Sequence, residues 1–155
     1  MSRPLAVLRD GTEVAAWVFK ANPDVWDVEA HLAGHGTVER WTLAPGYRGD
    51  LLAAGHPAVL WLTGRRAGII AAGTVTGAAY DDLDEGTGAL RRWAPVRLTA
   101  VDPVRKATLL ADPRCRRLEM VRSVRLGSPL ALARTELDAI EDLIGDGVRP
   151  VGSPT

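Results

Sequence analysis

The chain has almost no cysteine, which excludes two kinds of site. Cys115 is the only cysteine among 155 residues. An internal disulfide is therefore impossible, and a zinc site built from several cysteines is excluded as well. A single cysteine also suits a protein that works in a reducing compartment.

Long apolar runs are missing too. No stretch approaches the roughly 20 apolar residues that a membrane-spanning helix requires, and the N-terminus lacks the basic-then-apolar pattern of a signal peptide. We therefore expect a cytoplasmic protein with no membrane partner. Lysine occurs only twice, whereas arginine and alanine are abundant, which suggests a GC-rich genome.

The common catalytic motifs are absent. The sequence contains no H-E-x-x-H, G-x-S-x-G, P-loop or G-x-G-x-x-G pattern. His31 and His35 have the spacing of one helix face, but Gly34 and Gly36 argue against a helix there. The remaining histidine is His56. We therefore expect no metal site, no cofactor and no enzymatic activity.

What the chain does have is the composition of a globular protein. Its apolar and charged fractions, 46% and 25%, are those of an ordinary soluble protein. We expect a single domain over residues 1–147, monomeric or weakly dimeric, and a flexible tail rich in Pro, Gly and Ser over residues 148–155. The formal net charge is zero, so charge as a whole predicts no attraction to nucleic acid.

A buried strand and the turn after it organise the chain. Residues 14–19 are apolar and rich in β-branched and aromatic side chains, which predicts a core strand. Pro23 ends this strand, and Asp24 or Asp27 caps a helix expected over residues 27–32. The strand end and the turn present a cation, an amide and an indole, namely Lys20, Asn22 and Trp26. These residues are either a solvated strand end or part of a binding site.

Residues 37–49 are interrupted by one proline and two glycines, so we expect an irregular loop. This loop carries Trp41 and Tyr47. Aromatic side chains on a loop either plug the core beneath it or line a binding surface. Both interpretations stay open for Trp41, and core plugging is favoured for Tyr47.

The rest of the chain alternates strands with short helices. Apolar and alternating patterns predict strands over residues 57–63, 69–76, 92–101 and 129–132. The first of these strands carries Trp61 and ends at Thr63 and Gly64. A helical turn over residues 107–110 and an amphipathic helix over 135–144, capped by Thr135, complete the pattern. This order predicts an α+β domain in which short helices flank a strongly curved, mixed and partly closed β-barrel.

Charge is unevenly distributed despite its zero sum. Between Arg91 and Arg125 there are ten basic residues and three acidic ones, a local excess of seven positive charges. Guanidinium groups match phosphate oxygens, so this segment is either a phosphate-binding face or a solvated surface. The strongest phosphate candidates are Arg92, Arg117, Arg122 and Arg125. An acidic stretch over residues 81–85 lacks the ligand order of a calcium loop and is expected to be solvated.

Three segments together resemble the EVE domain, a member of the PUA-like superfamily that also includes YTH and ASCH domains. The first segment covers residues 17–28, and the second runs from residue 40 through the strands that end at residue 75. The third is Leu-Glu-Met-Val-Arg-Ser-Val-Arg-Leu-Gly-Ser-Pro over residues 118–129. The chain departs from the commoner family pattern at Ala21 and over residues 42–44.

The resemblance implies a PUA-like fold and a module that recognises a modified base in nucleic acid, often linked to bacterial restriction. The base would be 5-methylcytosine, 5-hydroxymethylcytosine or N6-methyladenine, flipped into a pocket of DNA or RNA. The pocket residues implied by the resemblance and the turn are Lys20, Asn22, Trp26, Trp41, Trp61, Thr63, Gly64 and Ser128. Trp41 and Trp61 would stack on the two faces of the base, and an effector nuclease or restriction component would be a partner.

Two other functions stay open at this stage. A related PUA-like enzyme acting on a modified nucleoside would use Lys20 as its nucleophile or acid. A protein-interaction domain would present its loop aromatics to a partner chain.

Overall fold

The computed structural model describes residues 3–145, and the predicted tail over residues 148–155 lies outside this range. The strands in this range are β1 (Ala6–Val7), β2 (Glu13–Val14), β3 (Ala16–Ala21), β4 (Thr37–Thr42), β5 (Pro57–Leu62), β6 (Gly68–Val75), β7 (Tyr80–Leu83), β8 (Leu90–Arg105) and β9 (Leu130–Leu132). The helices and 3₁₀ turns are α1 (Val28–His35), η1 (Tyr47–Leu51), α2 (Lys106–Leu110), η2 (Pro113–Cys115), α3 (Glu119–Arg122) and α4 (Arg134–Ile144). No helix in this part of the chain is long and apolar enough to span a bilayer.

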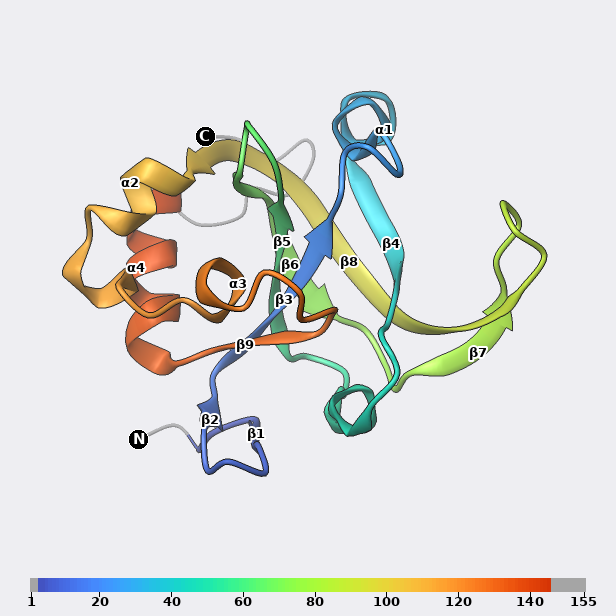
Figure 1. Ribbon diagram of the computed structural model, residues 1–155, viewed down its shortest axis with the longest axis horizontal. Helices are drawn as coiled ribbons and strands as arrows, with labels where there is room; N and C mark the ends of the chain where they lie inside the picture. The colour runs from blue at the N-terminus through green and yellow to red at the C-terminus, as the bar shows by residue number, and fades with distance from the viewer. Residues whose placement is uncertain (1–2, 146–155) are drawn as a thin grey trace.

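Seven of the strands form one curved mixed sheet (Figure 1). Its order is β4-β8-β6-β5-β3-β9, with β7 paired to β8. β3 and β5 run parallel, and β3 pairs with β9 in the antiparallel sense. The backbone N–H of Ala44 donates to the carbonyl of Ser128 at 2.9 Å, which links the segments beside the two edge strands. The predicted α+β class with a curved mixed sheet is confirmed, although this sheet is more open than a barrel.

The sheet buries apolar side chains on both faces. One face holds Trp17, Phe19, Leu60 and Leu62, together with side chains of α1 and β4. The other face packs against α2, η2, α3 and α4. Figure 1 shows α2, α3 and α4 gathered on one side of the central strands β3, β5 and β6, whereas α1, β4 and β7 lie on the other.

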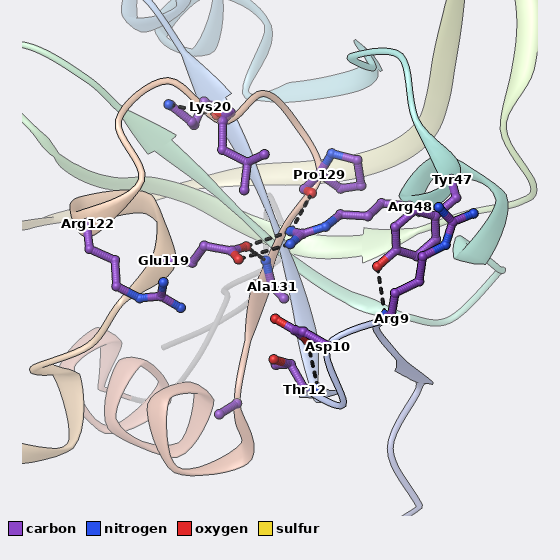
Figure 2. A network of polar contacts seen from close by, with 12 residues as sticks. Arg9, Asp10, Thr12, Lys20, Tyr47, Arg48, Glu119, Arg122, Pro129 and Ala131 are labelled. Carbon is purple, nitrogen blue, oxygen red and sulfur yellow. Dashed lines mark hydrogen bonds and ion pairs between the residues drawn. The ribbon is translucent and has the colours of Figure 1, made fainter.

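A partly buried ion pair ties η1 to α3 and β9 (Figure 2). Both guanidinium Nη atoms of Arg48 donate to the carboxylate of Glu119, at 2.6 and 3.0 Å, and the Ala131 amide donates to the same carboxylate at 2.9 Å. Burial raises the pKa of Glu119, but the hydrogen bonds from Arg48 and Ala131 outweigh it and hold that pKa below its ordinary value. The pair therefore fastens the 3₁₀ turn after β4 to the segment that leads into β9.

Three local predictions are wrong. Residues 37–42 form strand β4, where an irregular loop was expected; a bulge between Val38 and Arg40 breaks the alternation that marks a strand. Helix α1 continues past Gly34 to His35, because Asp27 caps its first turn and Gly36 adopts the left-handed conformation at its end. Helix α4 begins after Ala133, so Thr135 is not its cap.

Candidate functional site

A groove of about 1150 Å³ opens beside the end of β3. Its walls come from the turn between β3 and α1, from α1 and β4, and from the turn between β7 and β8. The lining residues are Lys20, Ala21, Asn22, Val25, Trp26, His31, His35, Thr37, Val38, Glu39, Arg40, Trp41, Thr42, Asp84, Glu85, Gly86, Thr87 and Trp93. Four of the predicted pocket residues, Lys20, Asn22, Trp26 and Trp41, are therefore brought together here.

The turn between β3 and α1 is held by Asn22. Its side-chain oxygen accepts a hydrogen bond from the Asp24 amide at 2.9 Å, and its carbonyl accepts from the amides of Val25 and Trp26. Such Asx turns fix the backbone locally without any core contact. Val25 and Trp26 therefore lie at the groove on an ordered turn. Val25 is 82% exposed, so these hydrogen bonds, rather than burial, hold its position.

Two indoles meet at the groove. The ring centroids of Trp26 and Trp41 are 5.8 Å apart, and their planes are inclined by 45°. Trp41 is 9% exposed and its Nε1 donates to the Lys20 carbonyl at 3.1 Å, so its orientation is fixed. Trp26 is 45% exposed and offers a large free aromatic surface. The pair combines an anchored ring with an accessible one, a suitable arrangement for stacking on a flat ligand.

The histidines of α1 extend this aromatic wall, which the sequence did not predict. The rings of His31 and His35 stack with centroids 4.3 Å apart, and the His31 ring lies 4.9 Å from that of Trp26. His31 Nε2 is 3.1 Å from the Thr37 carbonyl. The spacing of His31 and His35 correctly indicated one helix face, but Gly34 and Gly36 led us to predict no helix at these positions.

A third tryptophan, Trp93 on β8, was also missed. It lies opposite Thr42 in the β4–β8 ladder, and its Nε1 donates to the Asp82 carbonyl at 3.1 Å. The guanidinium carbon of Arg40 sits 3.7 Å from the centre of its ring, and Arg40 pairs with Asp82 at 3.2 Å. Trp93 thus forms part of the groove wall with a cation stacked on its face.

The predicted clamp between Trp41 and Trp61 is wrong. Trp61 is buried with Val59 and Ile69 in the cluster beneath α2 and α4, on the opposite face of the sheet from Trp41. Successive side chains of β5 alternate between the two faces, and Trp61 falls on the helix-covered one. Any aromatic stacking in the groove therefore depends on Trp26, which is the most exposed indole there and lies against Trp41.

Three other predicted pocket residues have structural roles outside the groove lining. The hydroxyl of Thr63 donates to the Ala21 carbonyl at 3.2 Å, and Ser128 Oγ accepts from the Lys20 amide at 2.8 Å. Gly64 lies in the β5–β6 turn with φ +93°. These contacts fix the end of β3 from both neighbouring strands and so support the groove indirectly.

The Lys20 ammonium is engaged by the loop that follows α3. Its Nζ donates to the carbonyls of Val124 and Leu126 at 2.7 and 2.9 Å. Burial lowers the pKa of Lys20, while carbonyl acceptors favour the charged ammonium. Because Arg125 lies between these two carbonyls in the chain, this contact holds the Arg125 segment next to the end of β3.

The other predicted phosphate-binding arginines lie outside the Val124–Leu126 loop. Arg92 on β8 makes an ion pair with Asp50 of η1. On α3, Arg122 Nε donates to the Arg117 carbonyl at 3.0 Å, and Figure 2 shows Arg122 next to the Arg48–Glu119 pair. The local charge excess is therefore divided between separate elements and partly neutralised.

Comparison with known proteins identifies the fold. Neither a scan of protein-family models nor a search of curated proteins gives a match. Among solved structures, a hypothetical protein from Leishmania major aligns with a TM-score of 0.63 and 14% identity, over 86% of this chain and 96% of that one. An ASCH protein from Zymomonas mobilis aligns with a TM-score of 0.50 and 13% identity, over 83% of this chain and 95% of that one.

A YTH domain, that of the MRB1 protein of Zygosaccharomyces rouxii, also aligns with a TM-score of 0.50. The identity is 15%, over 93% of this chain and 92% of that one, and the YTH domain was solved in complex with N6-methyladenosine RNA. The chain therefore shares its fold with ASCH and YTH domains, as the resemblance implied. The closer resemblance to EVE domains stays a prediction.

Proposed function

We propose that this protein binds nucleic acid and takes a modified base into the groove beside Trp26 and Trp41. The observation that carries the proposal is the indole pair, 5.8 Å apart, on a groove of about 1150 Å³. A flipped base presents two π faces and a hydrogen-bonding edge, and aromatic side chains are its usual contacts. A YTH domain with the same fold binds N6-methyladenosine RNA, which supports the proposal.

The groove also offers polar groups for the edge of a base. The Asn22 side-chain oxygen is used within its turn, which leaves the amide nitrogen free to donate. Thr37 and Thr42 add hydroxyl groups on β4. A methyl group buried against the indoles would add about 0.8 kcal/mol of binding free energy, enough to favour 5-methylcytosine or N6-methyladenine over the unmodified base by about fourfold.

Arg125 is the phosphate contact that best fits this geometry. It is exposed on the loop that the Lys20 ammonium holds, whereas Arg92 is paired with Asp50. Substitution Arg125→Ala should weaken binding to modified and unmodified strands equally and reduce the salt dependence of the affinity.

We propose binding rather than catalysis. The lowered pKa of Lys20 favours the enzyme alternative, but its ammonium already donates to two carbonyls of the Val124–Leu126 loop. Incubating the protein with modified nucleosides, followed by mass spectrometry, should show no product; turnover that Lys20→Met abolishes would establish the enzyme instead. Recruitment of an effector nuclease by the bound module is part of the same proposal.

The direct experiment is titration of short DNA and RNA strands that carry one modified base. Strands with 5-methylcytosine, 5-hydroxymethylcytosine or N6-methyladenine are compared with the same unmodified sequences by fluorescence anisotropy. We expect one modification to bind several-fold more tightly than its unmodified counterpart. Equal weak binding to every strand would rule the proposal out.

A further inference from the structure

Apart from His31 and His35, the groove and its ion-pair partners carry four carboxylates and three cations. Its lining residues and their ion-pair partners comprise the cations Lys20, Arg40 and Arg91 and the carboxylates Glu39, Asp82, Asp84 and Glu85. Arg40 pairs with Asp82, and Arg91 pairs with Asp84 at 2.9 Å. Within residues 3–145, Glu39 and Glu85 make no ion pair, so both bring a carboxylate without a cationic partner to the groove lining.

The aromatic wall of the groove also accepts a positive charge. The Arg40 guanidinium lies 3.7 Å from the centre of the Trp93 ring, and the attached Asp82 neutralises it. Trp26 presents a similar indole that is 45% exposed, with no guanidinium or ammonium over it among the described side chains. An exposed indole in a groove that is also lined by unpaired carboxylates favours a cationic ligand.

The same carboxylates disfavour phosphate at this wall. A nucleic-acid strand would keep its backbone near the Arg125 loop and send only a base toward Glu39 and Glu85. The charge of the base itself then becomes a determinant of affinity.

We propose that the groove selects a methylated base that carries a positive charge, such as 1-methyladenine or 3-methylcytosine; this rests on the function proposed above. Methylation of a ring nitrogen on the pairing edge leaves these bases cationic at neutral pH. It also blocks Watson–Crick pairing, so the base is already unstacked or easily flipped. A cationic ring stacked on Trp26 and flanked by Glu39 and Glu85 gains about 2- to 30-fold in affinity over a neutral isomer.

Isomeric bases test the charge separately from the methyl group. Labelled single strands that carry 1-methyladenine or N6-methyladenine, and 3-methylcytosine or 5-methylcytosine, are titrated at neutral pH beside unmodified strands. We expect the cationic isomer of each pair to bind more tightly. The double substitution of Glu39→Gln and Glu85→Gln should reduce the ratio of the affinities for the cationic and the neutral isomer, whereas Glu13→Gln on β2 should leave that ratio unchanged.

The outcomes distinguish this inference from the proposed function. If both isomers bind equally, and more tightly than the unmodified strand, the charge preference is refuted while base recognition stands. If the ratio of the affinities for the cationic and the neutral isomer is the same in the double variant as in the parent, the carboxylates do not contribute to the preference and the inference fails. If no methylated strand exceeds its unmodified control, the proposed function itself is refuted.

Discussion

Substituting Trp26 by alanine is the sharpest perturbation of the groove. Trp26 is 45% exposed, so its removal takes little apolar surface out of the core. Stacking of a base on an aromatic side chain contributes about 1–3 kcal/mol, which corresponds to about a 5- to 150-fold loss of affinity. We therefore expect Trp26→Ala to weaken binding of a modified strand by that factor while the protein keeps most of its stability.

The assay compares binding and folding in the same variants. Affinity is measured by anisotropy, and the free energy of unfolding is measured by denaturant titration. Trp61→Phe is the matched control, because Trp61 is 3% exposed on the opposite face of the sheet. It should reduce stability and leave affinity unchanged. A Trp26→Ala variant that binds as tightly as the parent would refute the role of the groove.

Three further predictions concern stability. Glu119→Gln should lower the free energy of unfolding by about 3 kcal/mol, because it leaves the Arg48 charge partly buried without its partner. Denaturant titration measures this free energy, and a loss below about 1 kcal/mol would show that the ion pair is dispensable. Trp17 Nε1 donates to His56 Nδ1 at 3.1 Å, and burial lowers the pKa of His56 below 6.5. Below about pH 6.5 the unfolded chain therefore binds more protons than the folded chain, so the free energy of unfolding should decline as the pH falls and be full above that pH. His56→Gln should flatten this decline, and an unchanged slope would contradict the account. Gly36→Ala should lower the melting temperature at a cost of about 1 kcal/mol, because Gly36 has φ 78°, and an unchanged melting temperature would be inconsistent with that strain.

Much of the fold could be predicted from the sequence because the strands are strongly apolar. The patterns correctly placed β3, β5, β6, β8 and β9, and the class followed from their order. Strand β4 was missed because its bulge spaces the buried Val38 and Trp41 by three residues instead of two. Helix α1 was cut short because Gly34 has poor helix propensity, which the caps at its two ends overcome.

Only half of the predicted pocket residues line the groove, for a different reason. Lys20, Asn22 and Trp26 are neighbours in the chain, so local sequence brings them together. The sequence could not show on which face of the sheet Trp61 lies. Both faces of β5 are buried, and its residues are all apolar, so no polar side chain distinguishes one face from the other. Trp93 joins the groove through the long-range pairing of β8 with β4, which no local pattern contains.

The indole N–H resonances of the five tryptophans test the central claim most directly. Two-dimensional ¹⁵N NMR spectra would be recorded while a strand carrying the preferred modified base is added, with assignments from single Trp→Phe variants. Recognition of a base in the groove predicts that the signals of Trp26, Trp41 and Trp93 shift while those of Trp17 and Trp61 stay in place. Shifts confined to Trp17 and Trp61, or no shift at saturating strand, would contradict it.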